Sequence, residues 1–145
     1  MTKLVLFAND KVGLRVAKFL IDSYPDDLAL VVVLNGSEIP LACKSAQIPW
    51  VTYTNEQELT QVLETIEFDL GLLAWWPHLI SEELLKKAPA GFINTHNSFL
   101  PFNKGKHPYF WALAEQTKYG VSLHYADNSI DGGDILAQTE ILYTW

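Results

Sequence analysis

The chain has 145 residues, a length typical of one domain, and its composition, 49% hydrophobic and 19% charged, excludes extended disorder. Its formal charge of −7, from 10 Lys and Arg against 17 Asp and Glu, comes without a run of basic residues, so we expect this domain alone to bind no nucleic acid. Cys43, the only cysteine, excludes an internal disulfide, and no apolar stretch is long enough to span a bilayer, so we expect a cytoplasmic protein without a membrane partner.

Strand and helix patterns alternate along the first half of the chain. Leu28–Leu34 is a continuous apolar run, typical of a strand covered on both faces. Thr54 followed by Gln57 resembles a capping box at the start of a helix, whereas Pro40 interrupts a weaker helical pattern. The predicted strands of this half are 3–8, 28–34, 50–53 and 68–74, and the predicted helices are 11–24, 37–47 and 54–65.

The second half continues with helices predicted over 81–88 and 108–116, and with strands predicted over 91–96, 120–126 and 135–143. The alternation favours an α/β, Rossmann-like fold of three layers, in which a mostly parallel sheet has helices on both faces. No linker or repeat interrupts the pattern, so residues 1–145 are predicted to form a single domain. The turn Asn9–Gly13 has one glycine where a dinucleotide-binding loop needs three, so the predicted sheet does not imply NAD or ATP.

An amide, an imidazole and a carboxylate follow strand-like segments in the second half. Asn94 and His96 are two positions apart, so their side chains are expected on one face of the strand that begins near Gly91. An Asn side chain donates hydrogen bonds to a developing oxyanion, and a His side chain transfers protons near neutral pH. Asp131, which precedes two glycines, would favour the protonated imidazole if it lay alongside, although Asp-Gly is also a common turn pair. These groups predict acyl transfer without a nucleophilic Ser or Cys.

The spacing of these residues resembles the signature of the 10-formyltetrahydrofolate-dependent formyltransferases, which act on glycinamide ribonucleotide, methionyl-tRNA or amino sugars. The resemblance runs from Phe68 to Ile141. The matching elements are Asn94-x-His96-x-Ser98-x-Leu100-Pro101, Gly105, Gly120-Val121-Ser122-Leu123-His124 and Asp131-Gly132-Gly133. Members of this family usually continue beyond the point where this sequence stops, so we expect a C-terminally truncated formyltransferase fold.

The resemblance implies a donor, a set of catalytic residues and two binding segments. Formyl transfer from 10-formyltetrahydrofolate to a primary amine would use Asn94 and His96 to stabilise the oxyanion and Asp131 to assist proton transfer. The residues expected to hold the pterin ring of the folate are Trp76, His78, Leu79, Ile80, Asp127 and Ile130. The acceptor is expected to be a nucleotide-linked amino sugar, held by Lys104, Lys106, His107 and Tyr109.

Several alternatives remain open. Methionyl-tRNA or glycinamide ribonucleotide is the runner-up acceptor, and an inactive folate-binding or structural domain is the alternative of a different class. His96, His124 and Asp131 make a plausible metal-ligand set, but Asn94 is better explained as an oxyanion donor, so we expect no metal. His124 is otherwise a packed core histidine or a neighbour of the site. Lys104–Trp111 is equally explained as a solvated basic loop, and a homodimer is one alternative for the oligomeric state.

Overall fold

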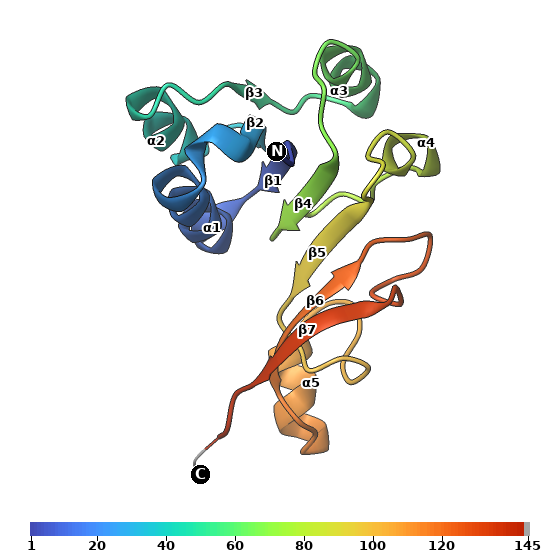
Figure 1. Ribbon diagram of the computed structural model, residues 1–145. Helices are drawn as coiled ribbons and strands as arrows, with labels where there is room; N and C mark the ends of the chain where they lie inside the picture. The colour runs from blue at the N-terminus through green and yellow to red at the C-terminus, as the bar shows by residue number, and fades with distance from the viewer. Residues whose placement is uncertain (144–145) are drawn as a thin grey trace. The chain divides into compact units, whose positions relative to one another are not determined.

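The computed structural model describes residues 1–143, which group into two compact units: an N-terminal unit of residues 1–91 and a C-terminal unit that begins at Phe92 (Figure 1). Thr144 and Trp145, which the predicted domain 1–145 includes, lie outside the described residues. Among residues 1–143, no helix is both long and apolar enough to cross a membrane.

Four parallel strands form the sheet of the N-terminal unit. They are β1 (Leu4–Ala8), β2 (Leu28–Val33), β3 (Trp50–Thr52) and β4 (Leu70–Ala74), in the order β3-β2-β1-β4. The register places Leu6 of β1 beside Val31 of β2 and Leu72 of β4. The chain moves outward from β1 to β3 and then returns to the other side of β1, so the carboxyl ends of β1 and β4 form a topological switch point.

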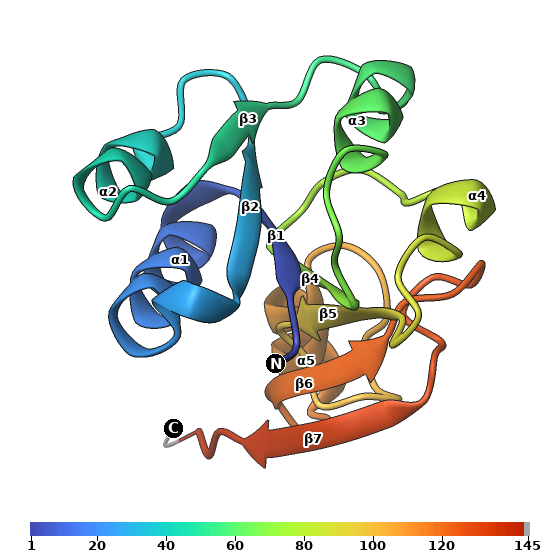
Figure 2. The same ribbon diagram turned by 45° about the horizontal axis from the view of Figure 1, so that its top comes forward.

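Helices lie on both faces of this parallel sheet, as predicted. α1 (Asp10–Ser23) and α2 (Ile39–Ser45) lie on one side of it, and α3 (Glu56–Leu63) lies on the other (Figure 2). The short helices η1 (Pro25–Asp27) and α4 (Glu82–Leu85) stand in the connections. Because successive side chains of a strand point to opposite faces, a sheet covered on both sides needs apolar residues throughout, which explains the continuous apolar run in β2.

The structure corrects the predictions made at the starts of α3 and α2. α3 is capped by Asn55, whose side chain accepts a hydrogen bond from the Glu58 N–H at 2.9 Å, so the predicted capping box at Thr54 is wrong by one residue. The Thr54 hydroxyl instead bonds the Glu58 carboxylate. Pro40 does not interrupt α2, because it stands in the first turn, where its missing N–H has no intrahelical partner to lose.

The C-terminal unit contains an antiparallel sheet. β5 (Phe92–His96), β6 (Gly120–Tyr125) and β7 (Ile135–Glu140) lie side by side in that order, and α5 (Pro108–Glu115) stands between β5 and β6 in the chain. β7 is shorter than predicted, because it ends at Glu140 rather than at Tyr143, and α4 of the N-terminal unit likewise ends at Leu85 rather than at Ala88.

α1 begins very close to the ends of β1 and β4, and Gly13 permits this approach. The Asn9 N–H donates to the Ala74 carbonyl oxygen at 3.1 Å. A Cβ atom at Gly13 would lie 2.9 Å from the carbonyl carbon of Ala8 and 3.1 Å from the Ala74 oxygen. Both neighbours are backbone atoms, so neither can rotate away from an added methyl group.

Gly13→Ala is therefore expected to lower the free energy of unfolding by roughly 1–3 kcal/mol through overpacking, although Ala favours helices more than Gly does. Urea unfolding measures the change, with Lys18→Ala, at an exposed position of the same helix, as the control. A Gly13→Ala protein as stable as the wild type would contradict the close approach of α1 to the sheet.

Candidate active site

The polar site is built on β5 and β6 of the C-terminal unit. Asn94 and His96 flank Thr95 along β5, and the register places them opposite His124 and Ser122 of β6. Because side chains two positions apart share a face of a strand, these side chains gather on one face of the sheet. His96, Ser122 and His124 are buried, so the two imidazoles are shielded from bulk water.

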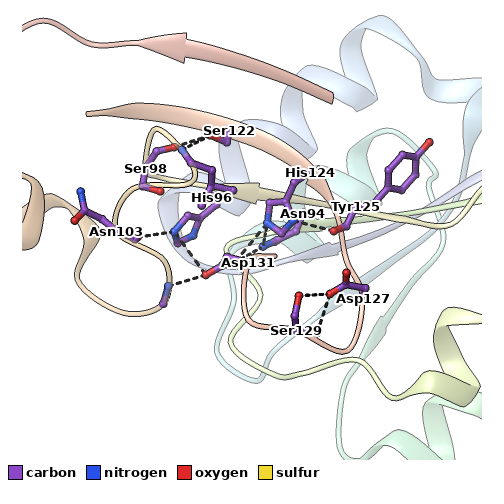
Figure 3. A network of polar contacts seen from close by, with 12 residues as sticks. Asn94, His96, Ser98, Asn103, Ser122, His124, Tyr125, Asp127, Ser129 and Asp131 are labelled. Carbon is purple, nitrogen blue, oxygen red and sulfur yellow. Dashed lines mark hydrogen bonds and ion pairs between the residues drawn. The ribbon is translucent and has the colours of Figure 1, made fainter. Parts of the chain in front are cut away.

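Asp131, from the loop between β6 and β7, lies between the two histidines (Figure 3). Its Oδ1 atom is 3.4 Å from His124 Nε2 and 3.5 Å from Asn94 Nδ2. Its Oδ2 atom is 3.6 Å from His96 Nε2 and accepts a hydrogen bond from the Gly105 N–H at 2.8 Å. The structure thus brings Asn94 and His96 together at the carboxylate of Asp131.

The β6–β7 loop holds Asp131 in the left-handed conformation, with φ of 51°. The loop is tight immediately after this residue. A Cβ atom at Gly132 would lie 2.2 Å from Ser129 Oγ, and one at Gly133 would lie 1.8 Å from the Tyr125 carbonyl oxygen. Glycine is therefore required at position 133, where the neighbour is a backbone atom at the end of β6, whereas the neighbour at position 132 is the end of a serine side chain, which can rotate away.

The loop between β5 and α5 contacts the site through its backbone. The Asn103 carbonyl oxygen lies 3.2 Å from His96 Nε2, and Asn103 Nδ2 donates to Thr117 Oγ1 at 2.7 Å. Because a carbonyl oxygen only accepts, His96 Nε2 carries the proton of this hydrogen bond. The side chain of Asn103 therefore anchors the carbonyl group that orients the His96 ring.

Ser122 and Gln138 hold the beginning of the same loop. Ser122 Oγ donates to the Ser98 carbonyl oxygen at 2.7 Å and accepts from the Leu100 N–H at 3.1 Å. Gln138 Nε2, on β7, donates to the Leu100 carbonyl oxygen at 2.6 Å and to Ser122 Oγ at 3.0 Å. The sequence pattern does not predict the roles of Asn103 and Gln138, because their hydrogen-bond partners are backbone groups or residues distant in the chain.

The charges around Asp131 favour an ion pair with His124. Burial raises the pKa of Asp131, but hydrogen bonds from His124 and from the Gly105 N–H, with the nearby charge of His96, outweigh burial and lower that pKa below its ordinary value. The hydrogen bond to Asp131 raises the pKa of His124 against the opposing effect of burial. His124, whose pKa is raised, is thus a residue that the sequence analysis considered only as a core histidine or a neighbour of the site.

The residues predicted to hold a pterin ring fall in both units. In the N-terminal unit, Trp76 makes edge-to-face contacts with Phe7, Tyr53 and His78, with ring centroids 5.4, 5.4 and 5.7 Å away. Leu79, in the same segment after β4, is 83% exposed. Trp76 and His78 are therefore brought together in one aromatic cluster, whereas Leu79 presents its side chain to solvent.

The other predicted binding residues lie in the loops that meet at Asp131. Asp127 Oδ1 accepts from the Ser129 N–H at 2.7 Å, and this turn precedes the exposed Ile130. The hydrogen bonds from Ser129 lower the pKa of Asp127. The side chains on either side of Gly105, and at the start of α5, are exposed: Lys104, Lys106, His107 and Tyr109.

The arrangement supplies what the addition of a nucleophile to a carbonyl group needs. Asn94 offers an amide N–H donor, and the histidines and Asp131 offer groups that hold and move protons. Within residues 1–143, no three or more His, Cys, Asp or Glu side chains form a group that could hold a metal ion.

Comparison with known proteins shows related sequences. The profile of the formyl transferase family matches residues 13–144. The methionyl-tRNA formyltransferase of Syntrophus aciditrophicus is 34% identical over 105 residues, which are 70% of this chain and 34% of that protein. The chain therefore spans about a third of the length of this relative.

Solved structures of similar proteins share the fold. A phosphoribosylglycinamide formyltransferase from Bacillus halodurans matches with a TM-score of 0.83 and 24% identity, over 99% of this chain and 81% of that one. A Mycobacterium tuberculosis protein, described as a candidate sugar N-formyltransferase, matches with a TM-score of 0.77 and 21% identity, over 99% of this chain and 56% of that one. These matches confirm the predicted α/β formyltransferase fold.

The pair formed by Asp131 and His124 is expected to stabilise the protein within a window of pH. A carboxyl group whose pKa is lowered from 3.8 on folding stabilises the fold above that value, and this contribution is lost as the pH falls through the folded-state pKa. A histidine whose pKa is raised from 6.5 on folding stabilises it below that value, and this contribution is lost as the pH rises through the folded-state pKa. Both contributions are present between pH 3.8 and 6.5.

Asp131→Asn should therefore lower the free energy of unfolding by roughly 1.5–3 kcal/mol at about pH 5, and by less once His124 has lost its second proton. Urea unfolding at several pH values measures the difference. Asp134→Asn, at an exposed position of the same loop, is the control. An equal loss at every pH would show that ionisation of the pair does not stabilise the fold.

Proposed function

This chain belongs to the formyl transferase family, and from that premise we propose that it transfers a formyl group from 10-formyltetrahydrofolate to a primary amine. The observation that carries the proposal is the convergence of Asn94, His96 and Asp131 in the C-terminal unit. These groups combine an oxyanion donor with proton carriers at one place, as transfer of an acyl group between two nitrogen atoms requires.

The proposed reaction begins with attack by the neutral amine. Its lone pair forms a bond to the formyl carbon, and the π electrons of the carbonyl group move to oxygen, where Asn94 and His96 stabilise the oxyanion by hydrogen bonds. When the oxyanion collapses, the bond between the formyl carbon and N10 of the donor breaks. Asp131 assists, through water, the loss of a proton from the attacking nitrogen, and N10 gains a proton. The products are the formylated amine and tetrahydrofolate.

We assign the donor to two segments, each by its own chemistry. After β4, the ring of Trp76 is held by aromatic neighbours, and Leu79 and Ile80 add apolar surface, as a mostly preformed site for a flat ring requires. In the loop that carries Asp131, the turn at Asp127 fixes the backbone before Ile130. Fixed backbone N–H and C=O groups suit the polar edge of a pterin.

The charge distribution favours a nucleotide-linked amino sugar as the acceptor. Lys104, Lys106 and His107 are exposed next to Gly105, whose N–H is bonded to Asp131. Cationic side chains attract a diphosphate, and the exposed ring of Tyr109 offers a face on which a sugar can stack. We therefore place the anionic part of the acceptor at this loop and its amino group toward Asn94.

The two runner-up acceptors have less support. Methionyl-tRNA, named for the relative from S. aciditrophicus, is a polyanion, whereas this chain has a net charge of −7 and lacks a run of basic residues. A phosphoribosyl acceptor, named for the B. halodurans structure, needs a phosphate site. At the start of α1, the Asp10 carboxylate accepts from the Lys11 N–H at 2.7 Å, and its negative charge opposes a phosphate there.

Release of tetrahydrofolate in the presence of a nucleotide-linked amino sugar tests the proposal. We expect saturable formylation by the wild type and a loss in kcat of about 100- to 1000-fold in Asn94→Ala, because one oxyanion donor is removed. Asn35→Ala, at an exposed position of the N-terminal unit, is the control and should keep its activity. Binding of a folate analogue without turnover of any amine would support the inactive folate-binding domain instead.

The assignment of the acceptor loop has its own test. Replacing Lys104 and Lys106 with Ala should raise the KM for an amino sugar nucleotide about tenfold, equivalent to roughly 1.4 kcal/mol, and should change kcat little. The effect should shrink at high salt, because salt screens exposed charges. Lys44→Ala, at an exposed position of α2, is the matched control. Formylation of methionyl-tRNA, with no turnover of any amino sugar nucleotide, would contradict the choice of acceptor.

A further inference from the structure

His124 has one ring nitrogen for which two neighbours compete. Its Nε2 atom lies 3.2 Å from Asn94 Nδ2 and 3.4 Å from Asp131 Oδ1. Its other ring nitrogen, Nδ1, lies 2.9 Å from the Tyr125 carbonyl oxygen. Because a carbonyl oxygen only accepts hydrogen bonds, Nδ1 carries a proton in both charge states, and Nε2 is where the ring gains or loses its second proton.

The two neighbours of Nε2 require opposite protonation states. The amide nitrogen of Asn94 only donates, so it pairs with Nε2 when His124 is neutral. The ionised carboxylate of Asp131 only accepts, so it pairs with Nε2 when His124 is protonated. One nitrogen cannot satisfy both, and the hydrogen bonds of Asn94 must therefore change when His124 changes its charge.

This change reaches the oxyanion donor. With neutral His124, one N–H of Asn94 binds Nε2 and the other points to Asp131 Oδ1, 3.5 Å from the amide nitrogen. Both N–H groups of the amide then have acceptors inside the protein. With protonated His124, Nε2 no longer accepts, and one N–H of Asn94 becomes available to the oxygen of a substrate.

We propose that His124 is a positioning residue: its protonated form frees the Asn94 amide to stabilise the oxyanion, and its neutral form holds that amide away from the substrate. The inference rests on the proposed function, in which Asn94 is the oxyanion donor. His124 touches no reacting atom itself and acts through Asn94 and Asp131.

Two carboxylates near His124 in the C-terminal unit favour its protonated form. Asp131 and Asp127, both in the β6–β7 loop, act on it as negative charges. On β5 the facing ionisable group is the imidazole of His96, with the two ring centroids 6.4 Å apart. On β7 the residue paired with His124 is the apolar Ile135. The hydrogen bond to Asp131 raises the pKa of His124, which extends the protonated form toward neutral pH.

The ionisation of the acceptor amine then limits the rate at low pH, and the ionisation of His124 limits it at high pH. The acceptor amine must be neutral to attack, so the rate rises with pH as the amine loses its proton. Loss of the second proton from His124 withdraws the oxyanion donor, so kcat falls at higher pH. The rate should therefore pass through a maximum whose alkaline side reports the ionisation of His124.

NMR of the free wild-type protein tests the switch without any substrate. The ring nitrogen shifts of His124 and the side-chain amide shifts of Asn94 are followed from about pH 5 to about pH 9. We expect the two sets to move with one midpoint, while the amide of the exposed Asn35 keeps its shifts. An Asn94 amide that does not respond while His124 titrates would overturn the proposal, and so would a His124 ring that keeps one charge state throughout. Neither result depends on whether the protein formylates any amine.

His124→Gln, whose amide does not titrate, provides the kinetic test. We expect its kcat at the optimum to fall by up to about 100-fold, because Asn94 is misplaced, and the alkaline decline of kcat to disappear while the KM for the acceptor changes little. A histidine with a merely structural role would instead give a lower kcat at every pH with the alkaline decline intact, and this result would overturn the proposal. If the variant does not fold, the NMR titration of the wild type decides.

Discussion

The contacts of a single carboxylate organise the C-terminal unit. Asp131 belongs to the loop between β6 and β7, and it accepts a hydrogen bond from the Gly105 N–H in the loop between β5 and α5. It also contacts side chains of β5 and β6. His96 and His124 are each less than a tenth exposed. Without the negative charge of Asp131, a positive charge on either ring would be buried with no compensating partner. The same atoms therefore hold the loops in place and set the charge of the site, so structure and chemistry cannot be altered separately at this position.

The support of the site comes largely from backbone groups. Ser122 and Gln138 bind the peptide groups of Ser98 and Leu100, and the Asn103 carbonyl oxygen orients His96. These contacts fix the start of the loop between β5 and α5 and the orientation of the His96 ring. A buried polar network of this kind is also demanding, because the loss of one member leaves its partners without hydrogen bonds in a shielded place.

Much of this architecture could be predicted from residue patterns. The apolar run in β2 predicted a buried strand because both faces of its sheet are covered, and the two-residue spacing of Asn94 and His96 predicted a shared face. Asp131 needed the family resemblance, because Asp-Gly alone is typical of a turn. Gln138 and Asn103 could not be predicted, since their partners are set by the tertiary fold. The cap of α3 was misplaced because Thr54 and Asn55 are both suitable capping residues, and only the geometry distinguishes them.

The loop that carries the basic residues meets the site through the Gly105 N–H and the Asn103 carbonyl oxygen. Every residue except proline has these main-chain groups, so the contacts do not depend on which side chains stand at positions 104, 106 and 107. Substitutions there can change the surface offered to a ligand while the hydrogen bonds to Asp131 and His96 persist. A mutant library at these three positions would therefore vary the exposed side chains next to the site and leave its main-chain contacts in place.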